Sequence, residues 1–174
     1  MKMQFTYNIF LIGFMGSGKS TVADYLCEKF DMDVVEMDQV IAERERMSIS
    51  DIFKKHGELY FRDLETKLLV ELQEKTNTVV SCGGGVAMRE CNVTEMKKNG
   101  KVVLLTAKPE TILERVENNH DRPLLENNKT VAYIAELMEK RREKYEAAAD
   151  MIIETDGKSA QKICEEMIQR LGEQ

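Results

Sequence analysis

Short apolar runs alternate with helical patterns along this chain. Four runs of three or four mostly apolar residues are typical of strands buried in a parallel sheet, and a weaker candidate lies between the first two. Because helical patterns separate the runs, the sequence predicts an α/β fold with a parallel sheet. In chain order, the predicted strands are Ile9–Ile12, Asp33–Glu36 (the weaker one), Thr78–Ser81, Val102–Leu105 and Met151–Ile153.

Helices are predicted where apolar residues recur every three or four positions. Ser20–Phe30 places Val22, Ala23 and Leu26 on one face, and Thr66–Lys75 carries Leu68, Leu69 and Leu72 at the same spacing. Lys129–Ala149 is long and highly charged, and Ser159–Leu171 closes the chain. No internal repeat interrupts this order.

Composition and charge narrow the possible functions. Hydrophobic residues make up 43% of the 174 residues, enough for the core of one domain spanning 1–174. The net charge of −6 argues against a nucleic-acid partner, which normally requires a basic face. No run of about 18 apolar residues is present, so we expect neither a membrane span nor a membrane partner.

The cysteines and the first residues point to a compartment. The four cysteines form no C-x-x-C pair, which disfavours zinc and thioredoxin-like chemistry, and they are typical of reduced cysteines in a cytosolic protein. Met1–Tyr7 is too short and polar for a signal peptide. We therefore expect a cytoplasmic protein.

Residues Gly13–Ser20 fit the phosphate-loop pattern G-x-x-x-x-G-K-[ST], between a predicted strand and a predicted helix. Glycines let backbone N–H groups turn toward phosphate oxygens, and the helix N-terminus adds a positive dipole. Lys19 would reach the β- and γ-phosphates, and the Ser20 hydroxyl would bind Mg²⁺. The motif alone indicates nucleotide binding, because GTPases, motor domains and small-molecule kinases share it. The expected nucleotide contacts here are Gly16, Ser17, Gly18, Lys19, Ser20 and Thr21.

Two carboxylates, Glu36 and Asp38, follow the second predicted strand, where α/β sheets bind ligands. One could hold Mg²⁺ through a water molecule and the other could accept the proton of a phosphoryl acceptor. An exposed pair of acids in a loop explains the same two residues equally well.

A possible acceptor site is spread over the rest of the chain. Arg62 and Glu65 are three residues apart and would share a helix face, although an exposed ion pair of this kind contributes little by itself. Gly83, Gly84 and Gly85 follow a predicted strand and would bring backbone N–H groups close to a ligand. Arg141 lies in a basic stretch that by itself would be a solvated face.

Residues 117–129 contain four asparagines and a proline, a composition that favours a mobile lid. A plain surface loop has the same composition. The arginine at position 122 favours a lid over a plain surface loop.

Taken together, these residues resemble the shikimate kinase family over nearly the whole chain. The phosphate loop is generic, but Phe-Arg-x-x-Glu, Gly-Gly-Gly and Arg-Pro-Leu in that order are specific. The matching stretches are Gly13–Thr21, Ser48–Phe53, Gly57–Glu65, Cys82–Gly85, Arg122–Leu125 and Arg141–Asp150.

The resemblance implies a fold and a reaction. The fold would be a three-layer α/β/α sandwich around a five-stranded parallel sheet, like the P-loop nucleoside monophosphate kinases, with a substrate-binding helical segment at about 38–65. The reaction would transfer the γ-phosphoryl group of ATP, with Mg²⁺ as cofactor, to the 3-hydroxyl of shikimate. A monomer is expected.

The resemblance also implies roles for individual residues. Asp38 would hydrogen-bond the attacking hydroxyl and act as base, and Arg62 and Arg141 would hold the shikimate carboxylate. Glu65 would orient Arg62. The remaining roles are a shikimate pocket lined by Gly83, Gly84 and Gly85, catalytic contacts of Lys19 and Arg122 with ATP phosphates, and adenine contacts of Arg115 and Lys158.

One position departs from the family pattern. The family usually has Asp-x-Asp where this chain has Glu36-Met37-Asp38, so Glu36 would hold Mg²⁺ through water with one additional methylene.

Two alternatives compete with this reading. Another P-loop small-molecule kinase, such as a gluconate or nucleotide kinase, would share the fold and much of the site. An ATP-binding regulatory module without turnover would share only the phosphate loop. The two arginines and the glycine run favour a compact carboxylate over a nucleotide as acceptor.

Overall fold

A computed structural model of the protein describes residues 4–116 and 130–172. Its five strands form one parallel sheet in the order β2-β3-β1-β4-β5, with the strand that precedes the phosphate loop in the centre. The strands are β1 (Asn8–Ile12), β2 (Asp33–Glu36), β3 (Thr78–Ser81), β4 (Gly100–Thr106) and β5 (Met151–Glu154).

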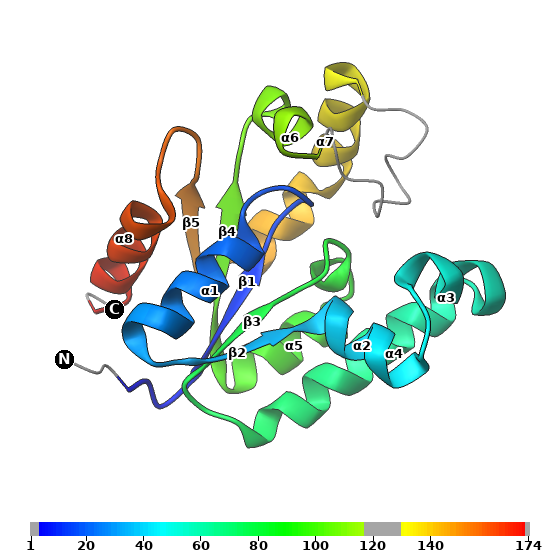
Figure 1. The fold of residues 1–174 in the computed structure, drawn as a ribbon, viewed down its shortest axis with the longest axis horizontal. Helices are drawn as coiled ribbons and strands as arrows, with labels where there is room; N and C mark the ends of the chain where they lie inside the picture. Colours follow the sequence, from blue (N-terminus) through cyan, green and yellow to red (C-terminus); the bar gives the residue numbers. More distant parts are fainter. Residues whose placement is uncertain (1–3, 117–129, 173–174) are drawn as a thin grey trace.

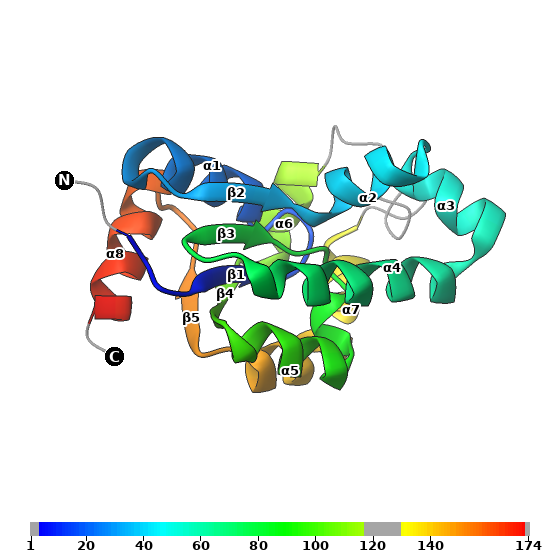
Figure 2. The same ribbon diagram turned by 90° about the horizontal axis from the view of Figure 1, so that it is seen from below.

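Helices connect the strands and cover both faces of the sheet (Figures 1 and 2). The α-helices are α1 (Lys19–Phe30), α2 (Met37–Glu45), α3 (Ile49–His56), α4 (Glu58–Glu71), α5 (Glu90–Lys98), α6 (Pro109–Val116), α7 (Val131–Ala148) and α8 (Ala160–Gly172). Two short 3₁₀ helices, η1 (Leu72–Glu74) and η2 (Val86–Met88), follow α4 and the glycine run respectively.

Alternation along the central strand divides the core into two layers. Ile9 and Leu11 of β1 pack with α1 and α8 on one face, whereas Phe10 and Ile12 pack with helices that include α4, α5 and α7 on the other. Since successive side chains of a strand point to opposite faces, a strand buried on both sides reads as a continuous apolar run. The three-layer α/β/α fold predicted from the sequence is confirmed.

The carboxyl ends of β1, β2 and β3 meet at one edge of the sheet, where the site lies. Residue pairs Leu11–Ser81 and Glu36–Ser81 are in register across the neighbouring strands. Beyond this edge lie α2, α3 and the beginning of α4, and α6 lies near the N-terminal end of α7 (Figure 1). Within the described residues, no helix is long and apolar enough to cross a membrane.

All five predicted strands are present, but several helices were missed. The helix predicted over Thr66–Lys75 covers the second half of α4, which begins at Glu58, and the 3₁₀ helix η1. Helices α2 and α5 bury only two side chains each, so neither has a clear apolar stripe. Helix α3 carried a signal that was overlooked, because the Ser48 hydroxyl accepts a hydrogen bond from the N–H of Asp51 and caps its N-terminus.

Candidate functional site

The phosphate loop connects β1 to α1 through residues 13–18. Gly13, Gly16 and Gly18 have φ angles of 146°, 79° and 104°, which side-chain-bearing residues rarely adopt. A Cβ at Gly13 would also collide with the backbone of Leu105 on β4. The glycines are therefore required by the backbone path, and the loop delivers the chain to the N-terminus of α1.

Two cations hold the ends of this loop. Lys19 Nζ donates to the carbonyl oxygens of Gly13 at 2.6 Å and Phe14 at 3.1 Å. From α6, Arg115 donates to the carbonyl oxygen of Gly16 at 2.9 Å and to the Thr155 hydroxyl at 3.2 Å. Positive charge thus flanks the loop on two sides, as an anionic phosphate chain requires.

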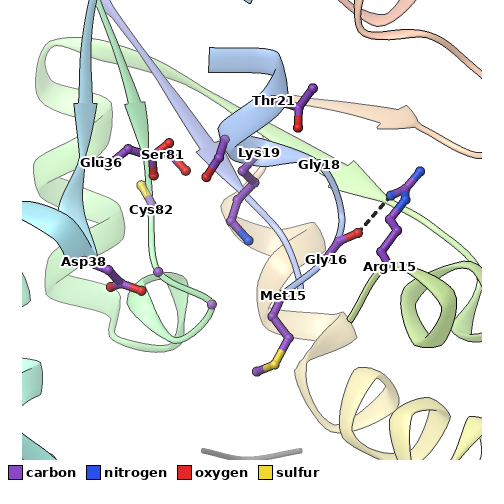
Figure 3. A pocket seen from close by; sticks show the side chains of 13 residues that line it. Met15, Gly16, Gly18, Lys19, Thr21, Glu36, Asp38, Ser81, Cys82 and Arg115 are labelled. Carbon is purple, nitrogen blue, oxygen red and sulfur yellow. Dashed lines mark hydrogen bonds between the residues drawn. The ribbon is translucent and has the colours of Figure 1, made fainter. Parts of the chain in front are cut away.

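A cavity of about 270 Å³ opens between the phosphate loop and the ends of β2 and β3. Figure 3 shows Glu36 and Asp38 on the opposite side of this cavity from Arg115, with Lys19 between them. The cavity gathers residues from four separate stretches of the chain. Its lining consists of Met15, Gly16, Gly18, Lys19, Ser20, Thr21, Glu36, Asp38, Ser81, Cys82, Gly83, Gly84 and Arg115.

Glu36 ends β2 beside two hydroxyl groups. Burial raises the pKa of its carboxyl group, while hydrogen bonds from Ser20 and Ser81 lower it. Carboxylate and hydroxyl oxygens are ligands that suit Mg²⁺, which commonly takes one or two protein oxygens and completes its shell with phosphates and water. Among the described residues, no group of three or more His, Cys, Asp or Glu side chains is placed to hold a metal ion.

Asp38, in the first turn of α2, and Glu65 of α4 meet across Gly83. A Cβ at Gly83 would lie 2.9 Å from a carboxylate oxygen of each residue. Glu65 is fully buried, and its Oε2 has no hydrogen-bond partner among the described residues. Burial raises the pKa of Glu65 to about 7, although the Arg62 guanidinium opposes the shift. A glycine is needed here because the two carboxylates take up the space beside it.

Arg62 lies between α4 and the glycine run. Its guanidinium pairs with Glu65 Oε1 at 2.8 Å and with Glu58 Oε2 at 3.2 Å. A Cβ at Gly85 would overlap this guanidinium, so the contact requires a glycine. The Arg62 Cζ also lies 5.3 Å from the ring centroid of Phe61, within cation–π range.

Arg141 approaches the same run from α7. A Cβ at Gly84 would lie 3.0 Å from the Arg141 guanidinium, and the Tyr145 hydroxyl donates to the Gly84 carbonyl oxygen at 2.5 Å. The Arg141 Cζ lies 5.8 Å from the ring centroid of Phe14, a phosphate-loop residue. Arg141 therefore stands between the glycine run and the phosphate loop.

The structure brings most of the sequence-predicted site residues together, but not all of them. The side chain of Ser17 is buried away from the cavity. Lys158 lies outside it and forms an ion pair of 2.9 Å with Glu166 of α8. The predicted lid at 117–129, with Arg122, lies outside the described residues.

Sequence reasoning missed three residues of the cavity lining: Met15, Ser81 and Cys82. Ser81 could have been found, because it ends the predicted strand that runs straight into the glycine run. Its register opposite Glu36, which lets the two side chains meet, becomes visible only in the sheet. Burial raises the pKa of the Cys82 thiol, which keeps this cysteine neutral.

The arrangement suits transfer of a phosphoryl group. Backbone N–H groups and Lys19 form one wall, and carboxylate groups at Glu36 and Asp38 form another (Figure 3). Two guanidinium groups border the adjoining glycine run. Such a site can bind polyphosphate, metal and a small anionic acceptor side by side.

Comparison with known proteins shows the family of this chain. The family model described as "Shikimate kinase" matches residues 15–172. A shikimate kinase of Persephonella marina is 45% identical over 164 residues, covering 94% of this chain and 98% of that protein. The structure of a shikimate kinase from Acinetobacter baumannii in complex with shikimate aligns with a TM-score of 0.89 at 32% identity, covering 95% of this chain and 92% of that one.

A second solved structure leads to the same family. The shikimate kinase from Aquifex aeolicus is 38% identical, with a TM-score of 0.81 and coverage of 95% of this chain and 96% of that one. The sequence motifs and the fold agree with these comparisons, and the chain belongs to the shikimate kinase family.

Proposed function

We propose that this protein transfers the γ-phosphoryl group of MgATP to the 3-hydroxyl of shikimate, giving shikimate 3-phosphate and ADP. The observation that carries the proposal is the placement of two guanidinium groups, Arg62 and Arg141, against consecutive glycines beside a phosphate loop. Arginine presents parallel N–H donors that match a planar carboxylate. A small carboxylic acid held there would have a hydroxyl within reach of the phosphates.

On the donor side, the loop N–H groups between Gly13 and Thr21 bind the phosphates of ATP. Lys19 exchanges its present contacts with loop carbonyl groups for the β- and γ-phosphates, where negative charge develops. Arg115 lies near the adenine end, and Lys158 and Arg122 are assigned to the nucleotide by family resemblance alone. Ser20, and Glu36 through water, would hold Mg²⁺, which neutralises phosphate charge when bound.

On the acceptor side, Asp38 receives a hydrogen bond from the attacking hydroxyl and takes up its proton. Its location at the cavity, next to the glycine run and across from Lys19, supports this role. Gly83, Gly84 and Gly85 line the acceptor pocket with backbone groups. Glu65 keeps the Arg62 guanidinium in place through the 2.8 Å ion pair. Positioning and electrostatic stabilisation account for most of the catalysis in reactions of this class.

An assay of ADP release with shikimate and its methyl ester tests the proposal. The ester keeps every hydroxyl but loses the charge, so it cannot form charge-assisted hydrogen bonds with the two guanidinium groups. We expect it to lose at least about tenfold in kcat/KM, since charge-assisted hydrogen bonds contribute about 1.5–3 kcal/mol each. Arg62→Lys should lower kcat/KM for shikimate and narrow the difference in kcat/KM between shikimate and its ester.

The same assay separates the alternatives. Equal values of kcat/KM for shikimate and its ester would contradict the binding of a carboxylate by Arg62 and Arg141. A higher kcat/KM for gluconate or a nucleoside monophosphate would assign the chain another acceptor. ATP binding without turnover on any acid would make it a binding module.

We also propose that the protein acts as a monomer in the cytoplasm, where ATP is available. Light scattering at assay concentrations, with a mass of 20.0 kDa expected for one chain, tests the oligomeric state. Fractionation of the source cells tests the compartment.

A further inference from the structure

A fully buried asparagine, Asn92, lies behind the acceptor half of the site. It occupies the first turn of α5 and has no exposed surface. Its side-chain amide bonds two other elements, since Nδ2 donates to the Val86 carbonyl oxygen at 2.9 Å and Oδ1 accepts from the Thr66 hydroxyl at 2.7 Å. Burying a side-chain amide is costly unless its groups are paired, so both bonds matter to the folded chain.

The orientation of this amide follows from its partners. The Val86 carbonyl oxygen can only accept, so the NH₂ group of Asn92 must face it. That leaves the amide oxygen for Thr66. The single proton of the Thr66 hydroxyl has two acceptors, this oxygen at 2.7 Å and the Arg62 carbonyl oxygen at 3.2 Å, and the shorter bond goes to Asn92. The same hydroxyl accepts from Arg89 Nη1 at 3.3 Å. Any side chain that replaces the NH₂ group by an acceptor would put two oxygens against each other.

Both partners of Asn92 are one step from a guanidinium contact. Val86 follows Gly85, whose Cα lies against Arg62, and η2 begins with the bond from Val86 N–H to the Gly83 carbonyl oxygen. Thr66 is one helical turn after Arg62 on α4, and next to Glu65. The amide therefore ties the glycine run to the helix that carries Arg62.

We propose that Asn92 and Thr66 are positioning residues that fix the glycine run against Arg62 and so set the affinity for the acceptor carboxylate. Neither residue lines the cavity at the phosphate loop. Loss of the amide bridge releases Val86 from α4 and lets Gly85 and the guanidinium drift apart, while β1, α1 and the phosphate loop keep their own contacts. The effect falls on the acceptor and spares ATP.

The inference rests on the proposed function, and the experiment separates the two. Isothermal titration measures the Kd for shikimate and, separately, for MgATP, and steady-state assays give both KM values. The variants are Asn92→Asp, which keeps the shape but sets an oxygen against the Val86 carbonyl, and Thr66→Val, which removes the hydroxyl donor. Thr66→Ser retains the hydroxyl, and Thr94→Val removes an exposed hydroxyl from the same helix as Asn92.

We expect Asn92→Asp to raise the Kd and KM for shikimate about tenfold and Thr66→Val about threefold, with values for MgATP within about twofold of wild type. Thr66→Ser and Thr94→Val should match wild type. An unchanged Kd for shikimate in Thr66→Val, or equal weakening of both ligands, would overturn the positioning role. If Asn92→Asp does not fold, the comparison of Thr66→Val with Thr66→Ser tests the positioning role. If wild type binds MgATP but no shikimate, the proposed function fails, and the positioning role fails with it.

Discussion

The two halves of the site are built in different ways. The phosphate half is one continuous stretch, residues 13–21, in which backbone geometry and one lysine provide the binding groups. The acceptor half draws single side chains from α2, α4 and α7 to the glycine run after β3. One of its charged side chains, Glu65, is fully buried. A local motif can therefore specify the first half, whereas the second exists only when distant segments pack.

This difference determines what a substitution does in each half. In the phosphate half, Lys19 bonds residues five and six positions away and Arg115 of α6 adds one bond to the loop, so a lost side chain removes its own charge and few other contacts. In the acceptor half, each charge is in contact with another element, so one substitution moves several neighbours. Three experiments test this contrast.

The largest effect should come from Lys19→Ala. Removing the charge opposite the developing phosphate charge should lower kcat by roughly 10²–10³, as expected for the loss of one electrostatic contact in a transition state. Steady-state kinetics with saturating substrates measures the change. Lys29→Ala, an exposed lysine of the same helix, is the control. Turnover within about threefold of wild type would show that the phosphate half does not depend on this charge.

A smaller, acceptor-specific effect is expected for Gly85→Ala. The added Cβ would overlap the Arg62 guanidinium, which is the mobile end of a long side chain and can shift without unfolding the protein. A displacement of about 1 Å in a binding group can cost up to about 100-fold, so KM for shikimate should rise about 10- to 100-fold. KM for ATP should stay the same. Gly172→Ala, where a Cβ meets nothing within 4 Å, is the matched control. Equal changes in both KM values would contradict the separation of the two halves.

The smallest effect concerns stability and pH. Because burial raises the pKa of Glu65 to about 7, the folded protein holds this proton more tightly than the unfolded chain does. The free energy of unfolding should therefore decline as pH rises from about 4.5 to about 7. Arg62 and Arg89 oppose the shift, and Asp38 reinforces it.

Glu65→Gln should remove that part of the decline, since the amide stays neutral and can donate to Asp38. Urea unfolding of both proteins at pH 5, 6, 7 and 8 gives the comparison. Glu95→Gln is a control at a carboxylate of α5 that lies outside the cavity. Parallel pH curves for wild type and Glu65→Gln would mean that Glu65 is ionised throughout.

The sequence predicted the sheet well because buried parallel strands read directly as apolar runs. Val102–Leu105 lies within the longer β4, and Thr78–Ser81 matches β3. Helices α2 and α5 escaped because each buries too few side chains to produce an apolar stripe. Their place in the fold depends on contacts with α4 and the sheet, which no local pattern records.

The site divides in the same way. The phosphate loop was identified in full from consecutive residues, and the glycine run was identified as a place of close approach. What approaches each glycine was not visible: two carboxylates at Gly83, Arg141 at Gly84 and Arg62 at Gly85. The buried amide of Asn92 was also hidden, because its importance comes from two partners that are 6 and 26 positions away in the sequence.

The sheet also sets the distance between the phosphate loop and the glycine run. The phosphate loop follows β1 and the glycine run follows β3, and these two strands are neighbours in the sheet. Backbone hydrogen bonds join them as far as the bond from the Cys82 N–H to the Leu11 carbonyl oxygen. Neighbouring strands are about 4.8 Å apart, and that spacing is fixed by backbone hydrogen bonds that no side chain can stretch. Donor and acceptor loops therefore begin from anchor points at a set separation. A change of specificity to another acceptor would therefore have to come from the length and charge of the side chains, because the distance between the starting points of the two loops is fixed by the sheet.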